Sequence, residues 1–207
     1  MPLRGEACSA RDDDQVKARI LRGTKRVRVI VLCMCLGAGS FGLASFAYGQ
    51  VVNTISTVDF GSYDFASSYS GNIQLGTDGA VQIVGSGIVS NGGEAAGHIQ
   101  ITSPSTGVVD IKCSQQAQLT DPSATSLTIQ NIEIAVNTGT TFGGGYACNG
   151  IGAGNSVATT IDLSALPNPN IYIGGEIVIA SPITLPSDHV YNTTGTGTPI
   201  MLSIVLQ

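Results

Sequence analysis

Cys113 and Cys148, the two cysteines in the later part of the chain, have the clearest chemical potential of any residues in the sequence. A pair of thiols can form a disulfide, bind a metal or supply a nucleophile. A metal site would need further ligands, and His98 and His189 are both remote in sequence from the cysteines. An even pair in an exported domain favours a disulfide. We therefore expect a Cys113–Cys148 bond, with a metal site or a reactive thiol as the alternatives.

The two histidines are the candidates for a general base in a hydrolase. Asp188 precedes His189, but neighbouring positions in the sequence do not orient an imidazole toward a carboxylate. The run from Gly150 to Gly154 resembles a nucleotide-binding loop only superficially, because it lacks the third glycine and no helical pattern follows it. We therefore expect no catalytic residues and no cofactor or metal.

The charged residues are distributed very unevenly along the chain. Eight of the nine Lys and Arg lie in the first 28 residues, and beyond them the only base is Lys112. After residue 47, ten acidic residues accompany that single lysine, which gives this region a formal charge of −9. Such a surface cannot neutralise a row of phosphates, so we expect no nucleic-acid partner.

Residues 1–47 have the composition of an export signal. Four bases between Arg22 and Arg28 precede an apolar stretch, and the small residues Ser45 and Ala47 occupy the −3 and −1 positions of a cleavage site. We expect cleavage after Ala47, which leaves residues 48–207 as one domain in the periplasm, at the cell surface or outside the cell. The alternative is a membrane anchor that is retained. No later stretch is apolar enough to span a membrane, so the processed domain is expected to have no permanent span.

The sequence after residue 50 favours short strands separated by turns rich in Gly, Ser and Asn. Apolar or β-branched residues alternate with polar ones, and no long pattern of helical period is present. This organisation predicts an all-β sandwich. The expected strands are Val51–Phe60, Ser70–Leu75, Ala80–Gly85, His98–Ser103, Gly107–Cys113, Ser126–Val136, Ser156–Leu163, Ile171–Ala180 and Pro199–Leu206.

Two of the expected strands carry additional information. In Ser126–Val136 the apolar parity changes after Ile129, so a bulge near Gln130–Asn131 is needed to keep one face buried. The C-terminal strand is either the last core strand or a segment that docks on an assembly partner by strand addition. Its four apolar residues share one face: Ile200, Leu202, Ile204 and Leu206.

Several short glycine-containing motifs follow one another in a recognisable order. They are Val58-Asp-Phe-Gly61, Ser70-Gly-Asn-Ile-Gln-Leu75, Thr77-Asp-Gly79, Val84-Gly-Ser-Gly87, Gly97-His-Ile-Gln-Ile-Thr102 and the ending from Tyr191 to Leu206. Over nearly all of residues 51–207 this order resembles a family of exported bacterial domains of unknown function, whose members resemble fimbrial, pilin-like subunits. The resemblance implies an immunoglobulin-like β-sandwich and a role in a pilus or another surface structure. The chain departs from chaperone–usher pilins at Leu206, where their terminal strand carries an aromatic residue.

The leading functional hypothesis is an exported, non-enzymatic structural or adhesive protein that resembles a fimbrial subunit. It would assemble by β-strand addition at an exposed edge. Its partners would be identical or related subunits and an assembly chaperone. The alternative is a monomeric extracellular module that binds a glycan or a protein, and an enzyme is the third hypothesis.

Overall fold

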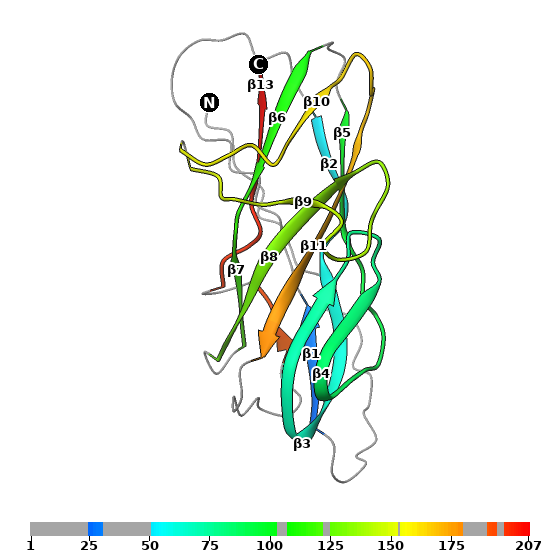
Figure 1. Ribbon diagram of the computed structural model, residues 1–207, viewed down its shortest axis with the longest axis vertical. Coiled ribbons are helices and arrows are strands. Elements are labelled where there is room, and N and C mark those ends of the chain that lie inside the picture. Colours follow the sequence, from blue (N-terminus) through cyan, green and yellow to red (C-terminus); the bar gives the residue numbers. More distant parts are fainter. Residues whose placement is uncertain are drawn as a thin grey trace, which may run out of the picture.

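The computed structural model describes residues 25–30, 51–102, 107–121, 125–152, 154–179, 190–193 and 197–207. These residues form thirteen β-strands and no helix, so this part of the chain contains no helix that could cross a membrane. The strands build a two-sheet sandwich, which confirms the predicted all-β class (Figure 1). The expected cleavage site at Ala47 and the pair Asp188–His189 lie outside the described residues.

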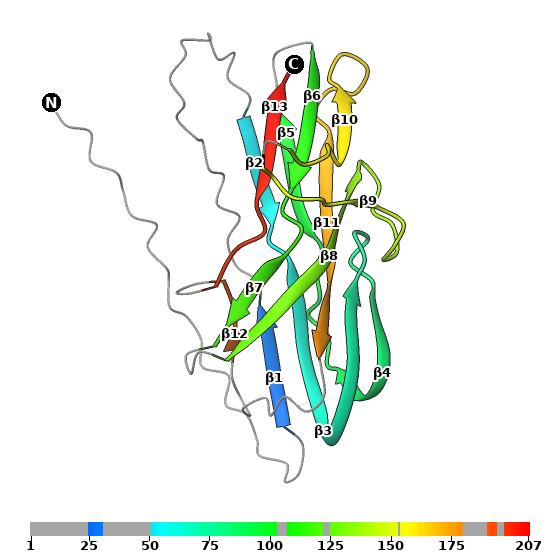
Figure 2. The same cartoon turned by 60° about the vertical axis from the view of Figure 1, so that its left-hand side comes forward.

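The larger sheet contains ten strands and the smaller sheet three. In the larger sheet these are β1 (Lys25–Ile30), β2 (Val51–Ser56), β3 (Asp59–Leu75), β4 (Val81–Ser90), β5 (Gly97–Thr102), β7 (Ala117–Thr120), β8 (Ser126–Val136), β9 (Tyr146–Ala147), β11 (Asn170–Ile179) and β12 (Val190–Tyr191). In the smaller sheet β6 (Val108–Cys113) lies between β10 (Thr159–Asp162) and β13 (Leu202–Leu206). Figure 2 shows the smaller sheet packed across one end of the larger one.

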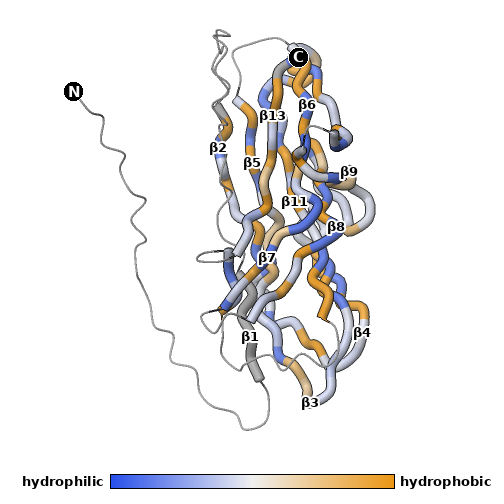
Figure 3. The backbone as a smooth tube through the Cα atoms, turned by 90° about the vertical axis from the view of Figure 1, so that its left-hand side faces the viewer, coloured by the Kyte–Doolittle hydropathy of each residue, from blue (hydrophilic) through white to orange (hydrophobic). Residues whose placement is uncertain are grey.

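Alternation along the strands builds the core between the two sheets. In β5, Ile99 and Ile101 are buried and the residues between them are half-buried, and in β6 the same pattern buries Val109 and Ile111. Apolar and polar segments alternate along the tube in Figure 3. Buried apolar residues from both sheets belong to one continuous cluster. The two sheets therefore share one hydrophobic core.

Two long strands, β3 and β11, change partners along their length and so join the parts of the larger sheet. On one edge of β11, the first half pairs with β5 and the second half with β3. On the other edge of β11, β8 pairs along most of its length. The sequence pattern predicts separate strands ending at Phe60 and beginning at Ser70, whereas β3 runs without interruption from Asp59 to Leu75. At Gly71, opposite Gly85 of β4, an added Cβ would lie 2.2 Å from the Val84 carbonyl oxygen. This close approach of two backbones requires glycine.

The predicted bulge in β8 is present. Gln130 pairs with Glu176 and Glu133 pairs with Gly174, so two residues of β8, Asn131 and Ile132, lie opposite one residue of β11. Asn131 adopts a φ of 48°, a left-handed conformation that asparagine tolerates better than most residues. The bulge corrects the change of parity, and Ile132 is buried like the apolar residues before it.

The buried carboxylate of Glu176 ties three neighbouring strands together at this bulge. Its Oε1 accepts hydrogen bonds from Asn72 Nδ2 at 2.7 Å and from Gln74 Nε2 at 2.8 Å, both on β3. Its Oε2 accepts a hydrogen bond of 2.6 Å from Asn131 Nδ2 on β8. Burial alone would raise the pKa of Glu176, but the amide donors outweigh it and hold the pKa below its ordinary value. The network is therefore built around an ionised carboxylate.

Candidate assembly site

Strand β1 lies in a slot between β3 and β12 (Figure 2). On one side it pairs antiparallel with β3, from Lys25 opposite Phe65 to Ile30 opposite Asp59. On the other side it pairs with β12, and this is the one parallel pairing among the described strands. Residues 25–30 fall within the predicted export signal, so a segment that the sequence analysis assigned to the leader completes the sheet.

The slot is the position at which a ring of strands closes. Beyond β12, a bridge between Asn192 and Thr120 connects to β7, which pairs with β8. Strand β8 pairs with β11, and β11 pairs with the second half of β3. The first half of β3 then pairs with β1. Removal of β1 from this ring would leave two facing strand edges without a neighbour.

The backbone of β3 is oriented to receive a strand in the slot. The Ser62 N–H donates to the Gly92 carbonyl at 3.1 Å, and the Ser62 carbonyl accepts from the Asn91 N–H at 2.8 Å. Both polar groups of Ser62 thus bond the turn that follows β4. Successive residues of a strand direct their N–H and carbonyl groups to opposite edges. The N–H and carbonyl of Tyr63 are therefore directed toward β1. An edge of this kind is a template for pairing with another segment.

The walls of the slot are aromatic and fully buried. Phe60, Tyr63 and Phe65 of β3 and Tyr191 of β12 are each at most 2% exposed. The ring of Phe65 lies 4.8 Å from that of Tyr69 in a tilted arrangement, which is ordinary core packing.

Acidic residues surround the slot. Burial raises the pKa of the Tyr63 hydroxyl, and the charges of Glu94 and Asp59 raise it further. Burial likewise raises the pKa of Tyr191 to about 12, with a smaller contribution from Asp121. Acidic side chains therefore lie near a buried tyrosine on both the β3 and the β12 side.

The two raised tyrosine pKa values predict alkaline unfolding. A free tyrosine ionises near pH 10, and both hydroxyls in the folded chain keep their protons to higher pH. The contribution of these two tyrosines to the free energy of unfolding is therefore fully present below pH ~10. It is lost as the pH rises toward their folded-state pKa values. Absorbance of tyrosinate at increasing pH should show a late, cooperative component that coincides with the loss of β-sheet circular dichroism. Tyr191→Phe should remove part of that component, and a non-cooperative titration centred at pH ~10 would contradict the burial of these rings.

The predicted disulfide is present. Cys113 and Cys148 are bonded, with their Cα atoms 5.0 Å apart. Cys113 ends β6 in the smaller sheet, and the N–H of Cys148 donates to the Ile132 carbonyl of β8 at 2.9 Å. The Gly150 N–H also donates to the Cys113 carbonyl, at 2.9 Å. The bond therefore links the two sheets and fixes the long glycine-rich loop to the sandwich.

The predicted assembly strand lies in the domain's own core. Ile200 and Leu202 are buried, and Ile204 packs against the core cluster. Strand β13 pairs antiparallel with β6, from Leu202 opposite Cys113 to Leu206 opposite Val109. The structure thus engages this segment as the last core strand, which was one of the two alternatives for it.

His98 has neighbours suited to a structural role. Its ring stacks on Tyr172 with centroids 4.5 Å apart, and its Nε2 lies 3.0 Å from Asn170 Oδ1. Across the described ranges, no three His, Cys, Asp or Glu side chains are grouped as metal ligands would be.

Comparisons with protein-family models, with curated proteins and with solved structures found no match to this chain. Sequence reasoning also missed the slot. The alternation of Val27 and Val29 with Arg26 and Arg28 is typical of a strand, but the same residues read as the basic part of an export signal. Strand β12, with two residues, is too short to be recognised by its pattern.

Proposed function

We propose that this protein is an exported, non-enzymatic structural subunit that assembles by β-strand addition, with the slot between β3 and β12 as the acceptor. The observation that carries the proposal is the position of β1, a six-residue strand that closes the sheet from outside the domain expected to remain after processing. Cleavage after Ala47 removes this strand's covalent tether. A strand from another subunit then takes its place.

The surrounding structure supports this reading. An unfilled slot would expose backbone groups and aromatic walls, so a chain in that state needs a partner. The inter-sheet disulfide fits an oxidising compartment. The expected partners are identical or related subunits, and an assembly chaperone that covers the slot before assembly. The alternative function is a monomeric extracellular module that binds a glycan or a protein.

Cleavage at the expected site should change the assembly state. The full chain, carrying a specific protease site between Ala47 and Tyr48, is folded under oxidising conditions and measured by size-exclusion chromatography with light scattering. We expect the uncut chain to be monomeric and the cut chain, once residues 1–47 have been removed, to form oligomers that electron microscopy shows as fibres when a strand-donating subunit is present. In the source cells, deletion of this chain should remove surface filaments.

The uncut chain with the same inserted site serves as the control for the insertion itself. A cut chain that has lost residues 1–47 and stays strictly monomeric even when a strand-donating subunit is added would contradict subunit assembly and favour the monomeric binding module.

A further inference from the structure

The chemistry around the slot selects the kind of strand that fits it. Asp59 and Asp64 lie on the β3 edge, Glu94 approaches Tyr63, and Asp121 approaches Tyr191 from the side of β12. Asp59 is held in place, because its Oδ1 accepts a 2.8 Å hydrogen bond from the Gly61 N–H. Glu94 is likewise held by the hydroxyl of Ser90. An occupant strand therefore enters a region with several fixed negative charges.

The segment seated in the slot matches this charge. Its sequence, Lys-Arg-Val-Arg-Val-Ile, has three bases in six residues. Arg26 is in register with Asp64, while Val27 and Val29 are in register with the buried positions Tyr63 and Gly61. Val27 and Val29 therefore alternate with Arg26 and Arg28, while Lys25 is in register with Phe65.

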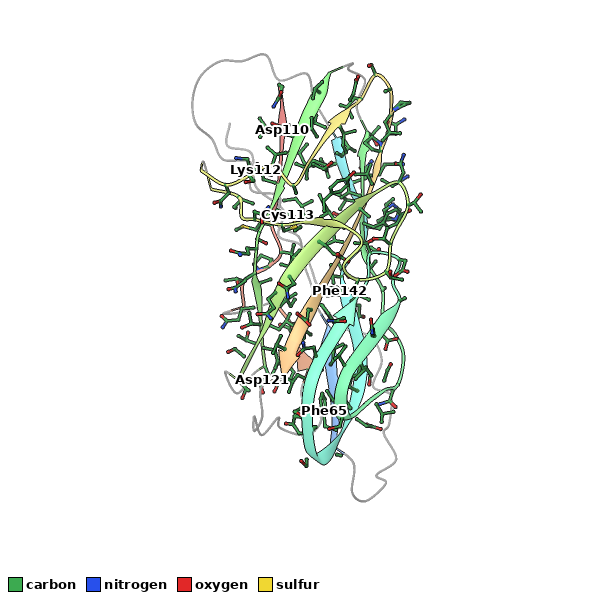
Figure 4. All side chains as sticks on the ribbon, viewed as in Figure 1. Phe65, Asp110, Lys112, Cys113, Asp121 and Phe142 are labelled. Atoms are coloured by element: carbon green, nitrogen blue, oxygen red, sulfur yellow. A yellow bond between two sulfur atoms is a disulfide. The ribbon has the colours of Figure 1, made fainter. Side chains whose placement is uncertain are left out.

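The remainder of the chain cannot supply such a strand. After residue 47 the only base is Lys112, on β6 of the smaller sheet. Figure 4 shows Lys112 beside Asp110 and Cys113, toward the opposite end of the molecule from Phe65 and Asp121. A second copy of residues 48–207 carries a formal charge of −9, and so does the copy whose slot it would approach. Like charges at this density oppose close approach.

We propose that the slot accepts a basic, alternately apolar strand from a different protein, and that it discriminates against acidic strands, including those of a second copy. This inference rests on the proposed strand-acceptor function and names the chemistry of its partner. The occupant runs antiparallel to Asp59–Phe65 and parallel to Val190–Tyr191, over about six residues, as β1 does. Backbone pairing provides much of the affinity, and the bases provide the selection.

Peptide exchange tests the inference. The full chain is cut at an engineered site after Ala47 and mixed with a fluorescent peptide of residues 24–31. Binding is followed by the fluorescence anisotropy of the labelled peptide. Reversal of three charges, one of them at Arg26 in register with Asp64, is expected to weaken binding about tenfold in the same peptide with K25E, R26E and R28E. The difference should shrink at about 0.5 M salt, where charges are screened.

Matched variants of the chain locate the effect. Asp64→Asn, in register with Arg26, should reduce the preference for the basic peptide, whereas Asp110→Asn on β6 should leave it unchanged. Equal binding of the basic and acidic peptides would overturn the selection of a basic strand. Self-assembly of the cut chain without any binding of the basic peptide would also overturn it, in favour of a second copy, while the strand-acceptor function stands. Tight binding of the basic peptide by a cut chain that never assembles would support the inference and contradict the subunit role.

Discussion

Replacing Cys113 and Cys148 together by alanine is expected to lower the free energy of unfolding by about 3–4 kcal/mol and the Tm by about 10 °C. The two cysteines are 35 residues apart in sequence, and a loop of that length loses substantial chain entropy when it is closed in the unfolded state. The bond also joins the two sheets, so its loss frees the glycine-rich loop on β8. Denaturant unfolding followed by circular dichroism measures the effect.

The background for this experiment is a chain in which the three leader cysteines, Cys8, Cys33 and Cys35, are replaced by serine, so that only the structural pair can be oxidised. In that background, adding a reductant to the parent should reproduce the loss seen in the double variant. If reductant and the double substitution both leave the denaturation midpoint unchanged, the bond does not stabilise the sandwich.

Glu176→Leu is expected to destabilise the fold by about 3–5 kcal/mol. The carboxylate accepts hydrogen bonds from Asn72, Gln74 and Asn131. Its removal takes the hydrogen-bond acceptor away from these three amide groups in a buried region. The free energy of unfolding of this variant should also depend less on pH. The pKa of Glu176 is lowered on folding, so its contribution is present above pH ~4.5 and is lost as the pH falls through the folded-state value.

Asp162→Asn is the matched control, because this carboxyl is exposed and bonds only its local turn through Ser164. Its effect on the denaturation midpoint at neutral pH should be small beside that of Glu176→Leu. Chemical denaturation at several pH values between about 3 and 7 compares the parent with both variants. An unchanged pH profile in Glu176→Leu would show that the network does not depend on an ionised carboxylate.

The elements predicted correctly are those whose local sequence pattern shows which of their residues are buried. Strands β5 and β6 alternate clearly and are buried on alternate positions. The change of parity in β8 requires a bulge, which the structure has beside Asn131. The disulfide is predicted from an even pair of cysteines in a domain that the sequence suggests is exported. In each case the prediction depends on a few neighbouring residues or on the presence of a particular residue type.

The features that were missed depend on contacts between distant segments. Strand β3 continues through a serine- and glycine-rich stretch because β4 and β1 pair along it, and nothing in residues 61–69 alone requires that. The two residues of β12 form a strand only because β1 lies beside them. Glu176 has an unremarkable context in sequence, and its three amide partners come from two other strands. Pairing over such separations leaves no local trace.

The disulfide and the slot lie in different parts of the sandwich, as the positions of Cys113, Phe65 and Asp121 in Figure 4 show. The covalent link joins β6 to the segment beside β8, whereas the slot is bordered by β3 and β12. Oxidation therefore does not have to wait for a partner. If the proposed strand addition operates, the disulfide can form while the slot is still empty, and oxidised monomers can persist until the incoming strand reaches them.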